Sequence, residues 1–217
     1  MTGNGGGGRA GRLPGLRAEG RPSAGPAQTH FVGILASEGL SETLMRCRHW
    51  MGEVYGCRSG WSTPMHVTLI PPFALREPGE IDALARAIEQ TARKADPFTA
   101  SAAGFGAFGE RTVFARVVPD PRWLELRDAL FAEASRALPG ILRKDARPFT
   151  PHLTVANRDI PAGAIPRALE RFGALGLDEA FPVDRIALFE RRGGVWEIAC
   201  AWEMGAPSAG DGANENA

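Results

Sequence analysis

Hydrophobic and polar positions follow one another in blocks along the first half of the chain, and these blocks predict alternating strands and helices. Residues 30–35 form an apolar run closed by polar residues, as in a buried strand. A helix is expected from Ser41, a candidate cap, to Tyr55, because apolar residues recur on one side. Four more elements follow: a strand at 65–70 stopped by two prolines, a helix at about 79–94, and hairpin-linked strands near 98–108 and 111–118.

The second half of the chain repeats this rhythm. Its predicted elements are a helix from Pro121 to Leu138, a strand at 151–157, a helix within 161–174 with Pro166 in its first turn, and strands at 181–190 and 194–203. We expect the last strand to be well covered. Helices mixed with hairpin-linked strands favour an α+β fold over a doubly wound parallel sheet. No glycine-rich phosphate loop follows a predicted strand.

The two ends of the chain differ from the part between them. Residues 1–28 are rich in Gly, Pro, Arg, Ala and Ser, and residues 205–217 have a similar character. Such segments bury too little apolar surface to offset the entropy of ordering, so we predict two disordered tails. The remaining residues, 29–204, are predicted to form one domain of two interleaved lobes.

Charge is balanced within this predicted domain. Residues 29–204 hold 21 Lys or Arg against 22 Asp or Glu. A protein that clamps long nucleic acid by its backbone is usually far more basic. The balance therefore favours a small or terminal phosphate substrate.

The cellular context is predicted from cysteines and apolar segments. The three cysteines, Cys47, Cys57 and Cys200, are odd in number and show no CxxC spacing, which fits a reducing compartment. The N-terminus has no apolar segment typical of a secretory signal, and no run approaches a membrane span of about 20 apolar residues. We expect a cytoplasmic monomer without membrane association.

One short pattern occurs twice and carries the candidate chemistry. Met65-His66-Val67-Thr68-Leu69 is echoed 86 residues later by Pro151-His152-Leu153-Thr154-Val155. Side chains alternate between the faces of a strand, so each copy presents a His and a Thr on one face and two aliphatic anchors on the other. The chain has four histidines in all, so two in matched contexts indicate a functional pair rather than histidines packed beneath a helix.

Two histidines suit phosphoester cleavage or transfer without a metal. One neutral imidazole can accept a proton from the attacking group while the other, protonated, donates to the departing oxygen. Thr68 and Thr154 would hydrogen-bond to the phosphoryl oxygens. Two alternatives remain: a nucleotide or RNA-end binding module with the same cleft but no turnover, and a metal site on His66 and His152. The metal site lacks further ligands at the usual spacing, and we expect no metal and no cofactor.

These motifs, with Phe31-Val32-Gly33-Ile34 opening the core, resemble the two-histidine phosphoesterase superfamily. Within it they are most similar to 2′-5′ RNA ligase-like proteins, which also act as RNA 2′,3′-cyclic phosphodiesterases. The resemblance covers about 30–203. It implies a bilobal, pseudo-twofold fold in which duplicated lobes of antiparallel sheet carry outer helices and the motifs face a central cleft. It also implies metal- and ATP-independent chemistry on an RNA terminus or a cyclic nucleotide, with ligation as the reverse direction.

The sequence differs from that of relatives at one position. Relatives often place Arg five residues after the second motif His, where this chain has Asn157, followed by Arg158. On a regular strand that shift changes face, so Arg158 needs a bulge to reach a phosphate.

Other substrate contacts are weaker predictions. We name Arg158 for the phosphate and Phe149 and Trp61 for a base, against the alternative that these rings pack in the core. Six basic residues are candidate rim contacts, each with surface solvation as the alternative: Arg58, Arg76, Arg111, Arg116, Lys144 and Arg147.

Overall fold

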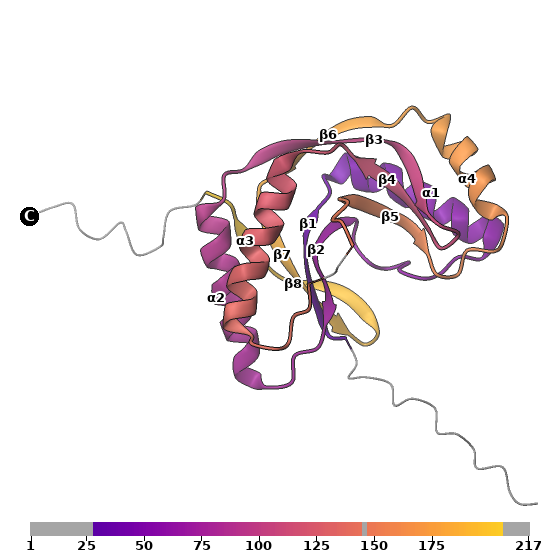
Figure 1. The fold of residues 1–217 in the computed structure, drawn as a ribbon. Helices are drawn as coiled ribbons and strands as arrows, with labels where there is room; N and C mark the ends of the chain where they lie inside the picture. The colour runs from indigo at the N-terminus through magenta and orange to yellow at the C-terminus, as the bar shows by residue number, and fades with distance from the viewer. Residues whose placement is uncertain (1–27, 145–146, 206–217) are drawn as a thin grey trace, which may run out of the picture.

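The computed structural model describes residues 28–144 and 147–205, and the strands within them form one antiparallel sheet (Figure 1). The eight strands of this described part lie in the order β6-β3-β4-β5-β2-β1-β7-β8. The elements along the chain are β1 (His30–Leu35), α1 (Glu38–Tyr55), β2 (His66–Phe73), α2 (Pro78–Lys94), β3 (Phe98–Phe108), β4 (Thr112–Val117), α3 (Pro121–Ala137), β5 (His152–Asn157), α4 (Ala164–Gly173), β6 (Asp178–Val183), β7 (Arg185–Arg192) and β8 (Val195–Glu203). The predicted antiparallel α+β fold is confirmed.

The strand order is symmetrical about the junction of β5 and β2. Outward from the junction, β5, β4, β3 and β6 on one side mirror β2, β1, β7 and β8 on the other. Each motif strand follows its outer neighbour in the sheet through a helix, as β1-α1-β2 in one half and β4-α3-β5 in the other. The halves meet through the single register pair Val67–Leu153, so the two predicted lobes share one continuous sheet.

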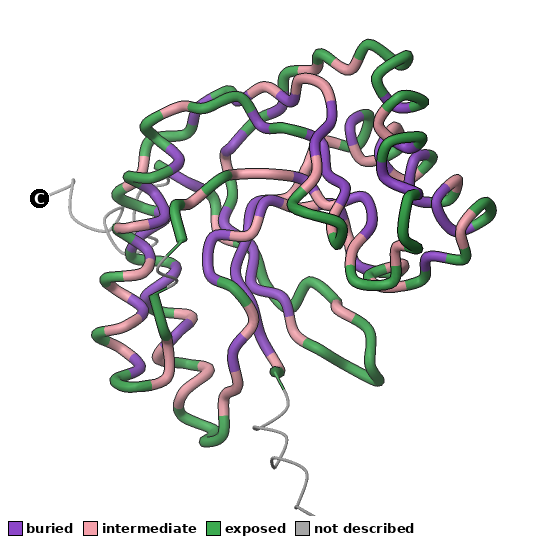
Figure 2. Tube along the Cα trace, turned by 45° about the vertical axis from the view of Figure 1, so that its right-hand side comes forward, coloured by how far each residue is buried: buried purple, intermediate pink, exposed green. Residues whose placement is uncertain are grey.

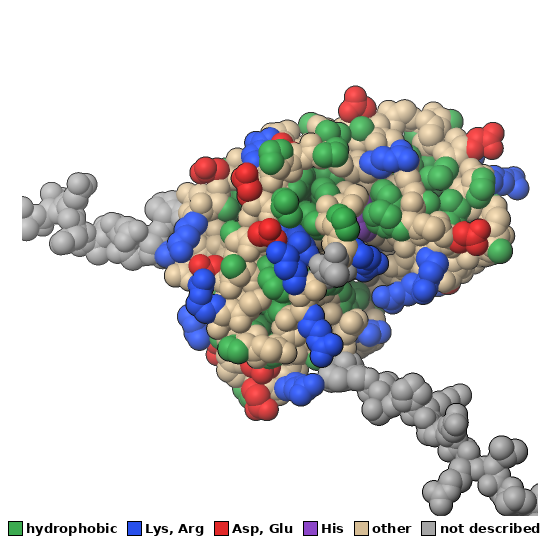
Figure 3. All heavy atoms as spheres, viewed as in Figure 1, with side chains coloured by type: hydrophobic (Ala, Val, Ile, Leu, Met, Phe, Trp, Pro, Cys, Tyr) green, Lys and Arg blue, Asp and Glu red, His purple; other side chains and the backbone are tan. Residues whose placement is uncertain are grey.

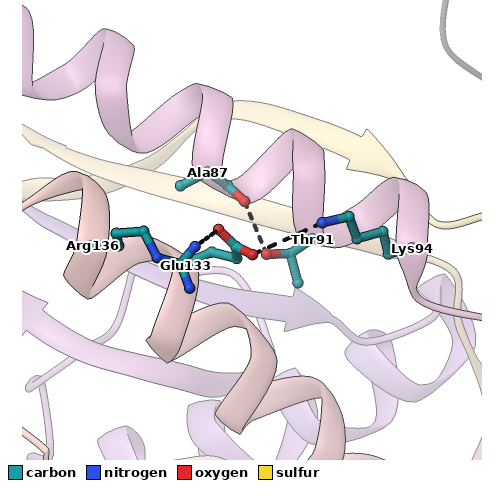
Figure 4. Close-up of polar contacts among 5 residues, drawn as sticks. All are labelled: Ala87, Thr91, Lys94, Glu133 and Arg136. Atoms are coloured by element: carbon teal, nitrogen blue, oxygen red, sulfur yellow. Dashed lines mark hydrogen bonds and ion pairs between the residues drawn. The ribbon is translucent and has the colours of Figure 1, made fainter.

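Two pairs of helices cover one face of this sheet. Helices α1 and α4 pack over β3, β4 and β5, whereas α2 and α3 lie side by side over β2, β7 and β8 (Figure 1). Between α2 and α3, Glu133 accepts from Arg136 and lies 3.9 Å from the ammonium of Lys94 (Figure 4). The main core lies between sheet and helices and includes Val67, Leu69, Leu153 and Val155, the predicted motif anchors.

Helix ends follow local sequence signals. Pro78 and Pro121 open α2 and α3, where a missing N–H costs nothing, and the Asp120 carboxylate accepts from the amide of Arg122. The predicted start of α1 at Ser41 was wrong: the helix begins at Glu38 after Ser37. The buried Leu40 belongs to its apolar stripe, so packing extends the helix towards its N-terminus.

The last part of the chain differs from its prediction in two respects. The expected strand at 181–190 is two strands broken at Asp184, because β6 pairs with β3 at one edge of the sheet and β7 pairs with β1 in the other half. Strand β8 was expected to be covered but is mostly exposed (Figure 2). It is an edge strand, and α2 covers it only in part.

Two sequence predictions bear on the remaining segments. The predicted tails, 1–28 and 205–217, lie outside the described residues except for residues 28 and 205. Within the described part, no helix is both long and apolar enough to cross a membrane.

Candidate active site

The two His-Thr pairs lie side by side on the face of the sheet opposite the helices, here called the motif face. His66, Thr68, His152 and Thr154 are each partly exposed, while Val67 and Leu153 between them are buried in the core. Val67 pairs with Leu153 in an antiparallel register, which places His66 level with Thr154 and Thr68 level with His152. The four predicted site residues are thus brought together, each His beside the Thr of the other motif.

Both imidazoles are oriented in the same way by the main chain. Nδ1 of His66 lies 2.7 Å from the carbonyl oxygen of Pro64, and Nδ1 of His152 lies 2.7 Å from that of Thr150. A carbonyl only accepts, so Nδ1 carries the proton and donates it in each case. In the neutral state, Nε2 of each ring is therefore left with its lone pair for proton transfer.

Each catalytic candidate also lies against two phenylalanines of the two strands outward from it. The ring of His66 is 4.6 Å from that of Phe31 on β1 and 5.2 Å from that of Phe189 on β7. The ring of His152 is 5.2 Å from that of Phe114 on β4 and 4.9 Å from that of Phe108 on β3. Within each pair the phenyl rings stack at 4.2 Å. Aromatic packing therefore fixes both imidazoles symmetrically.

The environment holds both histidines neutral. The pKa of His66 is lowered to about 4, mainly by burial and to a smaller extent by the nearby Arg48 and His152, while the hydrogen bond to the Pro64 carbonyl acts in the opposite direction. Burial also lowers the pKa of His152, while the Thr150 carbonyl acts in the opposite direction. His152 is the less enclosed of the two.

Among the predicted rim contacts, Arg116 lies beside the second motif. It is the Cα partner of His152, so both side chains leave the sheet on the motif face. Its guanidinium lies over β3, where a Cβ on Gly106 would meet Nε at 3.0 Å. The side chain is exposed and forms no ion pair within the described residues. In Figure 3 a histidine is visible in the recess between the two halves, with Lys and Arg side chains gathered around it.

The segment after the second motif explains the unusual Asn157-Arg158 sequence. Strand β5 ends at Asn157, and Arg158 has φ +70°, which takes it out of the strand. Its amide donates to the carbonyl of Arg111 at 2.8 Å. The Asn157 amide oxygen accepts from the Ser59 hydroxyl at 2.8 Å, so this position ties down the loop before β2 instead of presenting a cation.

The predicted aromatic contacts lie against helices. Trp61 packs over Gly52 of α1, 5.0 Å from the ring of His49. Phe149 packs against the main core under the guanidinium of Arg127, 4.9 Å away. Among the other rim candidates, Arg58 lies over the Trp61 ring and Lys144 pairs with Asp128.

The phenylalanines and one arginine were missed by sequence reasoning. Phe31 and Phe189 alternate with the core residues Val32 and Leu188, a period-2 signal that assigns them to the motif face. Arg48 sits at helical spacing between the buried Leu44 and Met51, and a charged residue in an apolar stripe could have been noticed. Within the described residues, no group of three or more His, Cys, Asp or Glu is placed to hold a metal ion.

Comparison with known proteins finds similar sequences. A family model of the 2′-5′ RNA ligase superfamily matches residues 42–195. An RNA 2′,3′-cyclic phosphodiesterase of Geobacillus stearothermophilus is 40% identical over 85 residues, 37% of this chain, and the match spans 26% of that relative's length.

Two crystal structures show the same fold at low sequence identity. The TT0787 protein of Thermus thermophilus has a TM-score of 0.63 at 21% identity, over 83% of this chain and all of that one. E. coli LigT, complexed with 3′-AMP, has a TM-score of 0.58 at 18% identity, over 82% of this chain and 99% of that one. Because the family model covers most of the described residues and both motifs, this chain belongs to the 2′-5′ RNA ligase superfamily.

Proposed function

We propose that this protein is a metal-independent phosphoesterase that acts on 2′,3′-cyclic phosphate or 2′-5′ phosphodiester ends of RNA or small nucleotides. The observation that carries this proposal is the crossed array of two histidines and two threonines, with both imidazoles oriented by matched carbonyls. The cyclic phosphodiesterase activity named for the Geobacillus relative supports the substrate class. The cytoplasmic location and the monomeric state stay predictions.

The reaction needs one proton acceptor and one proton donor. A water oxygen attacks phosphorus while Nε2 of one neutral histidine takes the water proton. The bond from phosphorus to a ribose oxygen breaks, and the other histidine, protonated at Nε2, donates its proton to that oxygen. The products are a phosphomonoester and a free ribose hydroxyl.

We assign the base to His66 and the acid to His152. His66 is the more enclosed ring and lies near the Arg48 charge, and both features favour its neutral form. His152 is less enclosed, and its carbonyl partner favours the cation. The negative charge of an arriving phosphate therefore raises the pKa of His152 further, and the imidazole takes its proton from solvent. This division gives each histidine the form that its step requires.

The threonines and Arg116 complete the phosphate site. The hydroxyls of Thr68 and Thr154 donate to the non-bridging oxygens, where negative charge resides throughout the reaction. Arg116, beside His152, supplies the cation that relatives often carry at the position of Asn157 here. Phe108 is 42% exposed and stacks on Phe114, so it offers a surface for a base. Arg158, Phe149 and Trp61 stay predictions as substrate contacts.

Turnover of a 2′,3′-cyclic nucleotide in the presence of EDTA tests the proposal. The wild-type protein should release a single phosphomonoester, and His66→Ala or His152→Ala should lower kcat by about 100- to 10,000-fold. His49→Ala, an exposed histidine on α1, is the matched control and should retain the wild-type rate. Tight nucleotide binding with no turnover would instead indicate the non-catalytic binding module.

A further inference from the structure

A buried arginine lies directly beneath the two motifs. Arg48 of α1 is 6% exposed, and the structure shows no ion pair for it within residues 28–144 and 147–205. A buried charge without a counter-ion is unfavourable unless other polar groups surround it.

The guanidinium of Arg48 is surrounded by main-chain carbonyls from two distant segments. Nη1 donates to Thr63 O at 2.6 Å and to Trp61 O at 3.3 Å, in the segment that leads into β2. Nη2 donates to Thr154 O at 3.0 Å and Nε to Val155 O at 3.3 Å, both within β5. One planar group therefore holds both motif-bearing segments at once.

These contacts lie next to the reacting groups. Thr63 immediately precedes Pro64, whose carbonyl orients His66. Thr154 is itself the phosphate-binding threonine of the second motif. Since β2 and β5 share only the pair Val67–Leu153, few main-chain hydrogen bonds fix the distance between the motifs. Arg48 bridges that junction with two hydrogen bonds to the segment before β2 and two to β5.

The other buried arginine of the described residues is compensated in a different way. Arg127 of α3, the helix that precedes β5, is also 6% exposed. Its guanidinium lies 3.6 Å from the Asp128 carboxylate and stacks over Phe149. The charge of Arg127 is thus compensated by an acid, whereas that of Arg48 remains uncompensated beneath the motif face.

We propose that Arg48 is a positioning residue for the phosphoester reaction. Its guanidinium couples the two motifs through their main chains and places an uncompensated positive charge under the phosphate. The expected effect of Arg48 on turnover rests on the proposed function. Two consequences follow. Loss of the planar group should misplace one motif relative to the other, and loss of the charge should make His66 easier to protonate.

Three variants separate the two consequences. Arg48→Met removes the charge and the links, Arg48→Lys keeps the charge but cannot reach four carbonyls in one plane, and Arg46→Met is the matched control at an exposed position of α1. We expect kcat on a 2′,3′-cyclic nucleotide to fall about 100-fold in Arg48→Met, because small misplacements of reacting groups have large effects. The kcat of Arg48→Lys should fall about 10-fold, and the kcat of Arg46→Met should equal that of wild type.

An NMR titration of the imidazole protons gives a readout that needs no substrate. In Arg48→Met the His66 signal should titrate at higher pH than in wild type, while His152 is unchanged and Arg48→Lys keeps the wild-type value. The ionisable groups that lower the pKa of His66 through their charge are Arg48 of α1 and, when protonated, His152 of β5. If wild type lacks turnover altogether, the proposed function fails, and this titration still decides whether Arg48 acts on His66.

If Arg48→Met does not fold, Arg48→Lys tests whether Arg48 couples the two motifs. An Arg48→Lys protein that turns over at the rate of Arg46→Met would overturn the coupling of the motifs. An unchanged His66 titration in folded Arg48→Met would overturn the electrostatic part.

Discussion

Gly33 lies against the ring of His66. Gly33 is the Cα partner of Thr68 on the neighbouring strand, and a Cβ built on it would sit 3.4 Å from Cδ2 of His66 and 2.6 Å from the carbonyl oxygen of Val67. The missing side chain allows the imidazole to extend across β1 to Phe31. A glycine in the strand thus shapes the site by close approach.

Gly33→Ala should therefore impair activity. The added methyl must displace β1 from β2 or move the His66 ring, so we expect kcat to fall by at least about 10-fold together with a lower Tm. Steady-state kinetics and thermal unfolding measure the two effects. Gly79→Ala in α2 is the control, because its Cβ meets nothing within 4 Å. Equal activity of the two variants would show that the His66 ring tolerates displacement.

Much of the site is predictable from the sequence because strand alternation acts locally. His66 and Thr68 must share a face once Val67 and Leu69 are buried, and the same holds for the second motif. The identity of the two partners across the β2–β5 junction is not local. Residues 66 and 154 come level only because the two halves meet at Val67–Leu153, and no pattern in either strand specifies that register.

The parts that the sequence did not predict depend on tertiary packing. The run 181–190 reads as one strand, but pairing sends its two ends to opposite halves of the sheet. Strand β8 has an apolar sequence and is exposed because it falls at an edge. The phenylalanines around each histidine come from separate strands, and only the assembled sheet brings them together.

The low pKa of His66 should appear as a loss of stability in acid. The ordinary value is 6.5 and the folded value is about 4, so between these limits the unfolded state binds a proton that the folded state does not. Stability is unaffected above pH 6.5 and falls as the pH decreases towards 4, by about 3 kcal/mol in all.

Urea unfolding at about pH 7.5 and about pH 5 measures this effect. Between these pH values, the free energy of unfolding of wild type should fall by about 2 kcal/mol more than that of His66→Gln, because glutamine cannot titrate. A His66→Gln protein that keeps the full acid dependence would show that His66 is protonated freely in the folded state.

Arg116→Ala should weaken substrate binding more than it slows chemistry. The guanidinium can leave its place over Gly104 and Gly106 to meet a phosphate beside His152, and the loss of one charge-assisted hydrogen bond corresponds to about a 10-fold rise in KM. Kinetics at low and high salt measure the change. Arg136→Ala, on the helix face beside Glu133, should leave KM unchanged. An equal KM in both variants would show that Arg116 does not contact the substrate.

The assignment of acid and base is tested with a substrate whose leaving group needs no proton. A nucleoside p-nitrophenyl phosphodiester releases an aryl oxide that is stable as an anion, so general acid assistance contributes little to its cleavage. If His152 is the acid, His152→Ala should recover most of its lost rate on the aryl substrate, while His66→Ala, which lacks the base, should stay slow on both substrates. Release of p-nitrophenolate is followed by absorbance, and the ratio of aryl to cyclic-phosphate turnover is compared for each variant. Recovery of His66→Ala but not of His152→Ala would make His66 the acid and His152 the base. Equal recovery in both would mean that both histidines assist the leaving group, and recovery in neither would mean that neither histidine works as a dedicated acid.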